Sequence, residues 1–598
     1  MIALPPVVEI NPFVLIFPPS AIHLYFNIFM ASVALYYYSN INPNSRPINV
    51  PTALLKQEYD FIIVGAGSAG CVLANRLTEV KNWTVLVLEA GGDETAVSDT
   101  PLFVGALWNS DQDWNYTTTP QRNACLADNE GRCRWPRGRG IGGSSTINAL
   151  LYVRGNRMDY DNWEALGNPG WGYSSIFPYF LRAEDNRNPK LFQSPYHRTG
   201  GFLTVSEAPY QTEMVPAYLR AANELGFDIL DYNGAIQNGF NIAQLTSRRG
   251  SRCSAGKGYL RPIRSFKNLN VAERAMVSKI LINNNSAYGV EFIRENETHI
   301  VTAKKEVIIS AGSINTPQLL MLSGIGPKRE LRKFGIPVIK NLPVGKNLQD
   351  HVGVPLVFKV DGPYTINQNV YGTVDALLQY AENQTGPLTT ASGFEVLGFF
   401  NSNTSGYGWT DVQIHIGSFV PTRQNLNLFE MVPLFLHPSS RGEVTIQSTN
   451  IFTPPLMNPK YFSRSPDFQM LLMASYIALN LSATLSLQEY NTTFFHEFYT
   501  PCQNITPNTE AFLICVIEQF TFTIYHPIGT CRMGSPKDPT TVVNPHLQVH
   551  GIKNLRVIDA SVMPRITSGN TNAPTIAIAE RASDLVKLYW NETTGVIL

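Results

Sequence analysis

The feature that most constrains this chain is a glycine-rich turn between an apolar run and a helical pattern. It is YDFIIVGAGSAGCVLANRL, residues 59–77. Residues 61–64 form a short apolar run, which is typical of a buried parallel strand. Gly65, Gly67 and Gly70 follow at once in the spacing G-x-G-x-x-G, and an apolar pattern with helical spacing continues after them. Strand, glycine turn and helix in this order predict a doubly wound unit that binds a dinucleotide.

Each glycine of the turn has its own role in the predicted unit. Gly65 permits a tight turn, Gly67 lets a pyrophosphate approach the backbone, and Gly70 lets the helix pack closely on the strand. The start of the helix offers unpaired N–H groups and a partial positive charge to phosphate. Glu89 ends the next apolar run, TVLVLEAG, where it can accept hydrogen bonds from ribose hydroxyls and disfavours the 2′-phosphate of NADP. The unit alone fits FAD or NAD, and the length of the chain favours FAD.

Length and charge narrow the class of protein further. The 598 residues exceed the roughly 250–300 at which a single hydrophobic core stops growing, so we expect two or more domains. Hydrophobic residues make up 44% of the chain and charged residues 15%, which is typical of a globular protein. Lys plus Arg equals Asp plus Glu at 46 each, so the formal net charge is zero. This balance gives no electrostatic reason to expect nucleic acid as a partner.

The N-terminal segment is apolar and has few charges. From Ser20 to Tyr38 there is no Lys, Arg, Asp or Glu, and the first cationic residue is Arg46. An apolar start followed by a polar stretch predicts a secretory signal peptide within residues 1–38, and hence a secreted protein. The alternative is an N-terminal hydrophobic segment that stays on the protein and anchors it in a membrane. Asn27 within the segment disfavours a stable membrane span, so none is expected.

Cysteines and possible glycosylation sites also fit an exported protein. Cys125 lies close to Cys133 in the sequence, and Cys502 lies close to Cys515, so both pairs can form disulfides in an oxidising compartment. Cys71 falls in the predicted helix and is expected to be a small buried residue. No spacing of Cys and His resembles a metal site. Asn-x-Ser/Thr triplets predict surface glycosylation, and they include Asn115, Asn296, Asn383, Asn403, Asn480, Asn491, Asn504 and Asn591.

A second glycine-rich segment leads to a family resemblance. RWPRGRGIGGSSTINALLYVRGNRMDYD, residues 134–161, fits either a solvated basic loop or a backbone cradle over a cofactor. Its GRGIGGSSTIN resembles the first signature of the glucose–methanol–choline (GMC) oxidoreductase family. GSINTPQLLMLSGIG, residues 312–326, is similar to the second signature, and HPIGTCRMG, NLRVIDASVMP and GNTNAPTIAIAERA are similar to the C-terminal segment. The motifs stand in the family's order, and the overall pattern is most similar to its insect branch, which includes glucose dehydrogenases with quinone acceptors.

The resemblance implies an α/β fold, with a discontinuous, doubly wound (Rossmann-like) FAD-binding domain and an inserted α+β substrate-binding domain. Residues 59–354 would form the N-terminal FAD-binding region, and residues 355–520 mainly the substrate-binding region. Residues 521–590 would return to the FAD domain and carry the catalytic residues. The residues that the resemblance places along FAD are Gly65, Gly67, Gly70, Glu89, Gly142, Gly143, Ser144, Asn148, Val277 and Asp559.

The resemblance also implies a reaction, the oxidation of an alcohol CH–OH group. The hydroxyl proton must leave as hydride moves to flavin N5, and a neutral imidazole with a pKa near 6.5 suits that task. The resemblance places His526 in this role and puts a second polar residue beside it. That residue is Asn570 here, with Asn572 as the alternative if the loop is shifted. Electrons would then pass to a quinone or to oxygen, and His437 is expected to be structural.

Two other functions stay open at this point. A cyanohydrin lyase of the same fold would keep the flavin without net redox turnover. A catalytically silent binding protein would keep only the fold, although the presence of both His526 and Asn570 argues against it. No motif identifies the substrate, and NQTGPLTTASGFEVLGFF, residues 383–400, is expected to border the substrate pocket.

Overall fold

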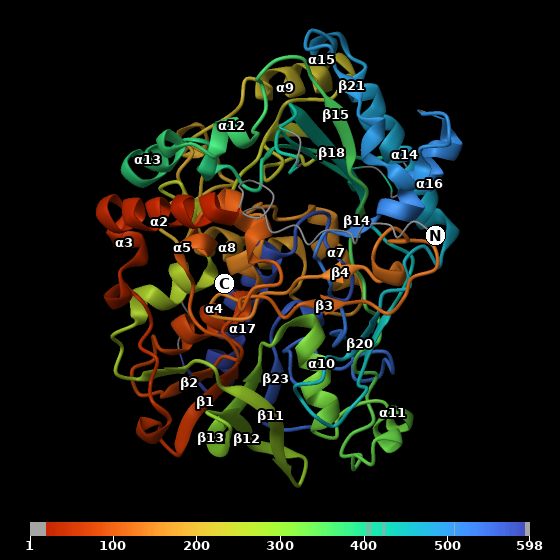
Figure 1. The fold of residues 1–598 in the computed structure, drawn as a ribbon. Helices are drawn as coiled ribbons and strands as arrows, with labels where there is room; N and C mark the ends of the chain where they lie inside the picture. The colour runs from red at the N-terminus through yellow and green to blue at the C-terminus, as the bar shows by residue number, and fades with distance from the viewer. Residues whose placement is uncertain (1–18, 403–405, 407, 422–424, 508, 593–598) are drawn as a thin grey trace.

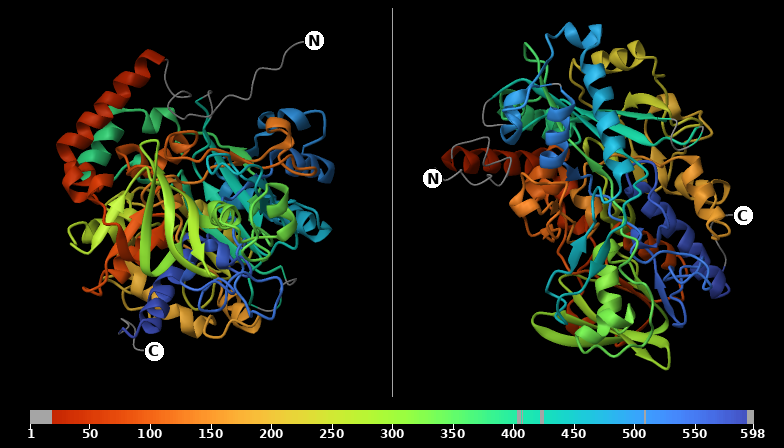
Figure 2. Two further views of the ribbon diagram at one scale, coloured as in Figure 1. Left: turned by 90° about the horizontal axis from the view of Figure 1, so that it is seen from below. Right: turned by 90° about the vertical axis from the view of Figure 1, so that its right-hand side faces the viewer.

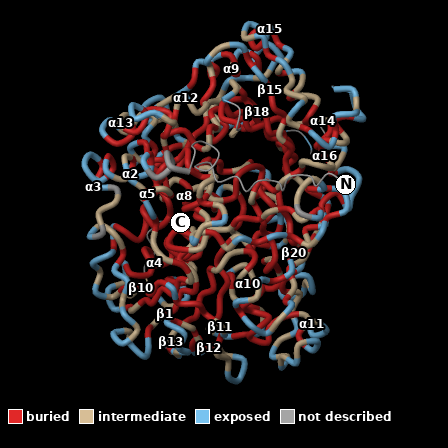
Figure 3. The backbone as a smooth tube through the Cα atoms, in the orientation of Figure 1, coloured by how far each residue is buried: buried red, intermediate tan, exposed pale blue. Residues whose placement is uncertain are grey.

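The chain is built on two large β-sheets. A computed structural model describes residues 19–402, 406, 408–421, 425–507 and 509–592. The seven-stranded sheet lies at the bottom of the molecule as drawn in Figure 1, and the eight-stranded sheet lies at the top. Figure 2 shows the same separation from the side. Buried segments run through both sheets and the region between them, while exposed segments form the outer loops (Figure 3).

The seven-stranded sheet contains the predicted doubly wound unit. Its parallel strands are β10 (Leu269–Ala272), β2 (Val85–Leu88), β1 (Glu58–Val64), β13 (Glu297–Ile309) and β23 (Leu555–Val557). β1 lies between β2 and β13, which explains why its second half is an unbroken apolar run. The antiparallel strands β12 (Ser286–Arg294) and β11 (Met276–Asn283) extend the sheet beyond β13.

This domain is discontinuous in sequence, as predicted. β23 comes from the C-terminal segment and pairs with the last residues of β13. The helix that follows, α17 (Asn572–Tyr589), packs against α4 (Ser68–Leu77), which begins at the glycine turn. α10 (Gly312–Leu322) packs against β11. The structure therefore confirms the fold class expected from the family resemblance.

Close packing at the glycine turn depends on two of its glycines. A Cβ on Gly70 would lie 1.9 Å from the carbonyl oxygen of Gly65, so no larger residue fits there. Gly65 itself has a φ of +97°, a conformation that favours glycine. The polypeptide itself therefore requires glycine at both positions, whether or not a ligand is bound.

The eight-stranded sheet is antiparallel throughout. Its main path runs β21 (Thr493–Phe494), β15 (Leu356–Lys359), β18 (Leu428–Phe435), β17 (Val412–Gly417), β16 (Phe394–Phe400) and β7 (Gly239–Ile242). β14 (Val352–Gly353) connects β18 to β22 (Phe522–Thr523). Because β7, β14 and β22 lie outside residues 355–520, flanking segments of the chain complete this sheet. The domain boundaries expected from the sequence stay a prediction.

The N-terminal helix packs onto the body of the protein. α2 (Pro19–Tyr36) contacts α13 (Val374–Asn383), and Figure 1 shows it beside that helix. The buried side chains of this contact include Tyr25, Phe29, Val33, Phe103 and Tyr380. Within the described part of the chain, no helix has the length and apolarity needed to cross a bilayer. Residues 1–18 lie outside the described residues, so the signal peptide and the anchor stay predictions.

The cysteines form the pairs that the sequence suggested. Cys125 is bonded to Cys133 with a Cα–Cα distance of 5.4 Å, and Cys502 is bonded to Cys515 with a distance of 6.0 Å. Cys71 is buried in α4, as expected. Of the asparagines singled out for glycosylation, Asn403 lies outside the described residues and the other seven are exposed.

Candidate active site

A cavity of about 1070 Å³ connects the two sheets. Gly65, Gly67 and Glu89 of the doubly wound domain line one part of it. Residues of the eight-stranded sheet and of the C-terminal segment line another part, including His526 and Asn570. The cavity therefore brings the predicted cofactor-binding and catalytic residues to one site.

The space next to the Cα of Gly67 is not filled by other atoms of the protein. Its φ is −76°, which any residue can adopt, and a Cβ there would meet no other atom closer than 3.9 Å. Since no protein atom requires glycine at this position, the open space suits a ligand that approaches the backbone. Gly67 is also the N-cap of α4 and makes no side-chain capping bond, so the start of this helix can donate N–H groups to phosphate.

The second glycine-rich segment lies directly against the first. A Cβ on Gly143 would lie 2.7 Å from the Cα of Gly67, and the φ of Gly143 is +53°. Ser144 begins the short helix α6 (Ser144–Ile147), and both Ser144 and Asn148 line the cavity. Gly142 packs against Thr146 instead, where a Cβ would come within 2.2 Å of the threonine hydroxyl. The segment has the shape of a backbone cradle, not of a solvated basic loop.

Glu89 lies directly after β2 and is buried. Its carboxylate oxygens accept hydrogen bonds from the N–H groups of Ala66 at 2.8 Å and of Gly91 at 2.9 Å. Burial raises the pKa of Glu89, and these backbone bonds oppose that rise. The N–H of Gly140 also bonds to this carboxylate. A carboxylate has about four lone-pair positions, so roughly one of them is left for a ribose hydroxyl. Val277 of β11 lines the cavity as well.

Asp559 also lines the cavity, but its carboxylate is engaged with the protein. One oxygen accepts hydrogen bonds from the N–H of Gly312 at 2.9 Å and from the hydroxyl of Thr316 at 2.6 Å. The other accepts from the N–H of Ser561 at 2.8 Å. These bonds join the start of α10 to the C-terminal segment. Asp559 therefore holds two pieces of the discontinuous domain together beside the predicted path of FAD.

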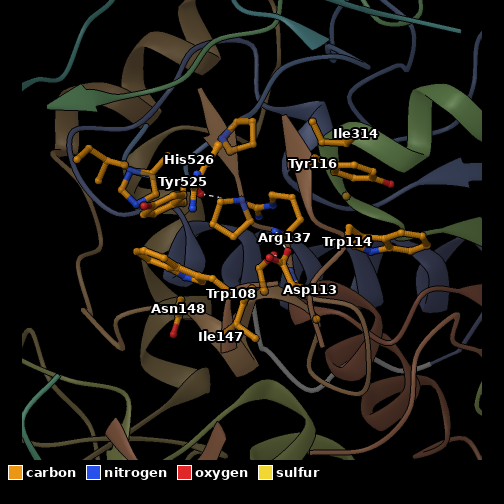
Figure 4. Close-up of a pocket in the computed structure, with 18 of the residues that line it drawn as sticks. Trp108, Asp113, Trp114, Tyr116, Arg137, Ile147, Asn148, Ile314, Tyr525 and His526 are labelled. Carbon is orange, nitrogen blue, oxygen red and sulfur yellow. Dashed lines mark hydrogen bonds between the residues drawn. The ribbon is translucent and has the colours of Figure 1, made fainter. Parts of the chain in front are cut away.

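The backbone around His526 is tightly constrained. The residue before it, Tyr525, has a φ of +64°, which is rare for a residue other than glycine. The N–H of His526 donates a hydrogen bond to the buried carboxylate of Asp350 at 2.9 Å. The Tyr525 ring lies 5.6 Å from the ring of Trp108, and Figure 4 shows both beside His526 in the cavity wall. Backbone strain of this kind is found most often at functional sites.

The hydrogen bonds of His526 determine which of its nitrogens carries the proton. His351 Nε2 lies 3.0 Å from the carbonyl oxygen of Leu436, which can only accept, so Nε2 of His351 is protonated. Burial lowers the pKa of His351 to about 3, so the ring is neutral and its Nδ1 is an acceptor. That atom lies 3.0 Å from His526 Nδ1, which must therefore donate.

The other nitrogen of His526, Nε2, consequently has the lone pair that a base needs. Burial is the largest of the effects that hold the pKa of His526 well below its ordinary value, so the imidazole is neutral at physiological pH. With the proton on Nδ1, the lone pair is on Nε2. Asn570 Nδ2 lies 3.2 Å from this Nε2. The Asn570 amide is oriented by Gln413, whose Nε2 donates to Asn570 Oδ1 at 3.2 Å.

The structure distinguishes the two candidate asparagines. Asn570 contacts His526, whereas Asn572 is the first residue of α17 and accepts a hydrogen bond from Ser68 at 2.7 Å. His437 makes structural contacts, with its Nε2 2.9 Å from the hydroxyl of Ser568. The geometry therefore places Asn570, and not Asn572, beside the proposed base.

Several residues of the site had no recognisable signal in the sequence. His351 follows Asp350 in GKNLQDH, and that adjacent Asp-His pair was the only available hint. Gln413 and Glu430 lie on strands whose pairing brings them to the site. His415, which belongs to no motif in the sequence, lines the cavity as well, and burial lowers its pKa to about 3.

Comparison with known proteins decides the family. GMC oxidoreductase family models match residues 59–353 and 438–579. The chain belongs to the GMC oxidoreductase family. Among GMC relatives, glucose dehydrogenase (FAD, quinone) of Drosophila pseudoobscura is 37% identical over 565 residues, covering 89% of this chain and 87% of the relative. Human mitochondrial choline dehydrogenase is 37% identical over 553 residues, covering 89% and 90%.

Solved structures of GMC-type oxidases have the same fold. A variant of formate oxidase from Aspergillus oryzae aligns with a TM-score of 0.81 at 28% identity, covering 90% of this chain and 99% of that one. Pyridoxine 4-oxidase from Mesorbium loti aligns with a TM-score of 0.78 at 27% identity, covering 90% and 100%. This GMC oxidoreductase is therefore an FAD-dependent enzyme, and the space at Gly67 and the carboxylate of Glu89 fit the nucleotide part of that cofactor.

Proposed function

We propose that this protein oxidises the CH–OH group of an alcohol, with His526 as the general base and Asn570 as the residue that orients the hydroxyl. The observation that carries the proposal is the neutral imidazole of His526. Its Nε2 lies 3.2 Å from the amide nitrogen of Asn570 in the cavity that also contains the nucleotide-binding glycines. Two such groups beside a flavin site are what alcohol oxidation needs.

The residues of the chain have defined tasks in this reaction. FAD, when bound, supplies the acceptor for the hydride that leaves the carbinol carbon. His526 Nε2 accepts the hydroxyl proton, and His526 Nδ1 keeps its hydrogen bond to His351. The amide of Asn570 donates a hydrogen bond to the substrate oxygen as negative charge develops there. General-base help of this kind contributes roughly 10²–10⁴ in rate.

The proposal extends to the electron acceptor and to the location of the protein. A quinone or oxygen would reoxidise the flavin, and the similar Drosophila enzyme carries quinone in its name. Secretion and glycosylation are supported by the two disulfides and by the seven exposed Asn-x-Ser/Thr asparagines. A retained N-terminal helix that anchors the protein is the alternative location.

A panel of sugar, aromatic, terpenoid and steroid alcohols tests the proposal. Each alcohol is assayed with a dye acceptor and, in parallel, by detection of peroxide. We expect at least one alcohol to bleach the bound flavin, and the two assays then separate a quinone-type acceptor from oxygen. Cyanide release from a cyanohydrin without bleaching would indicate a lyase instead. Purified protein that stays colourless after addition of FAD would indicate a silent binding protein. None of the relatives named above supports either of these alternatives.

A further inference from the structure

Among the residues that the structure describes, one carboxyl group in the cavity has no hydrogen-bond or ion-pair partner. Glu430 lies on β18 and lines the cavity. No hydrogen bond or ion pair to its carboxyl group comes from any residue that the structure describes. Burial raises the pKa of Glu430 to about 8, and no neighbouring charge opposes this rise. Glu430 is half-buried and lines the cavity, so a ligand that enters the cavity and supplies the missing hydrogen-bond partner gains affinity.

The register of the sheet places Glu430 on the same face as the catalytic end of the cavity. On β17 and β18, Gln413 pairs with Leu434, and Gly417 pairs with Glu430. Gln413 holds the Asn570 amide, so its level on the sheet marks the position of the reacting hydroxyl. Four residues separate the two levels, which corresponds to about 13 Å along the strands.

The wall between these two levels is largely apolar and aromatic. His415 and Val432 pair with each other between the two levels, and both line the cavity. Burial keeps the His415 ring uncharged at neutral pH, since it lowers the pKa of that ring to about 3. Other apolar side chains that line the cavity around this sheet are Phe394, Phe419, Phe522, Ile524 and Tyr525. A substrate that reaches from His526 to Glu430 therefore needs an apolar body.

We propose that Glu430 is a specificity-determining residue that binds a hydrogen-bond donor at the far end of an elongated, largely apolar alcohol. The inference rests on the proposed function, because it assumes that the carbinol group lies at His526. A hydroxyl or an ammonium group supplies the donor. A protonated carboxyl group can both donate to and accept from a hydroxyl, and an ionised one pairs with ammonium beside aromatic rings.

A matched series of linear primary alcohols tests the inference. Each alcohol of increasing length is compared with its counterpart that carries a terminal hydroxyl and with its counterpart that carries a terminal amine. In the wild type, kcat/KM is expected to rise when the donor is added to alcohols long enough to span the cavity, and to stay flat for short ones. The variant E430L should reduce that advantage roughly 10- to 100-fold, whereas E430Q, which keeps hydrogen-bonding atoms, should retain most of it.

The controls separate this inference from the proposed function. The effect of E430L is read as the ratio of kcat/KM with and without the terminal donor, which cancels any general loss of activity in the variant, and the flavin absorbance of both proteins should match. Ligand-induced rises in melting temperature, measured with the same compounds, give a readout that does not depend on turnover. If no alcohol reduces the flavin of the wild type, the proposed function fails. If alcohols react but a distal donor gives no advantage that E430L removes, the role of Glu430 is wrong.

Discussion

At the scale of single residues, a row of hydrogen bonds determines the chemistry of His526. The carbonyl of Leu436 requires a proton on His351 Nε2, and His351 in turn requires a proton on His526 Nδ1. His526 Nε2 is then left free to act as a base beside Asn570. His351 touches neither the substrate position nor the cofactor position that we infer, so it acts as a positioning residue.

Replacing His351 tests this tautomer argument. H351F removes the acceptor for His526 Nδ1, so the imidazole can place its proton on Nε2 and lose its function as a base. We expect kcat for alcohol oxidation to fall roughly 10- to 100-fold, with the flavin content and KM little changed. H351N keeps a hydrogen-bonding side chain and should lose less. Equal rates of flavin reduction in wild type and H351F, measured by stopped flow, would contradict the role of His351.

The raised pKa of Glu430 predicts how its replacement alters stability with pH. The pKa is about 8 in the folded protein and 4.5 for an ordinary glutamate. Between these values the folded state holds a proton that the unfolded state releases, so stability from this group is present below pH 4.5 and is lost as the pH rises to 8. E430Q cannot titrate, so its stability relative to wild type should rise over this window by on the order of a few kcal/mol. Melting temperatures at pH 5 and pH 8 check this, and a constant difference between the two proteins would contradict it.

At the scale of elements, glycine is needed for different reasons at two positions of one turn. The protein itself excludes a Cβ at Gly70, whereas only the open cavity lies at Gly67. G70A should cost about 3 kcal/mol or more in unfolding free energy, because strand and helix must separate. G67A should leave the stability of the flavin-free protein unchanged and weaken FAD binding. Flavin content and melting temperature, measured with and without FAD, distinguish the two effects, and equal loss of stability in both variants would contradict the distinction.

The sequence predicted the features that come from contiguous motifs, but not the contacts between segments that lie far apart in the chain. The glycine turn and the C-terminal HPIGTCRMG motif are contiguous, so the doubly wound unit and His526 could be predicted from them. Gln413 reaches Asn570, and Glu430 reaches the cavity, only because β17 and β18 pair in one register. The residues next to them in the sequence do not indicate that pairing. The His351 contact joins residues that lie 175 positions apart. Such contacts are set by tertiary structure, which a single sequence does not display.

At the scale of the whole molecule, the open question is whether the mature protein keeps its N-terminal helix α2. A signal peptide that ends near residue 38 would remove α2, yet Tyr25, Phe29 and Val33 of this helix are buried against the catalytic body. Removing residues 1–38 should lower the unfolding free energy by several kcal/mol, since each large apolar side chain contributes about 1.5–3 kcal/mol on burial. Melting temperatures of the full chain and the truncated chain test this. Equal values would show that α2 adds nothing to stability. N-terminal sequencing of the protein purified from its native source would show which form occurs.

We infer that the neutral imidazole of His526 takes the alcohol proton. The most direct test is anaerobic stopped-flow reduction of the bound flavin by an alcohol substrate, in wild type, H526A and H526Q. We expect the flavin to be reduced about 10²–10⁴ times more slowly in both variants, while the flavin stays bound. Reduction at the wild-type rate in H526A would contradict it.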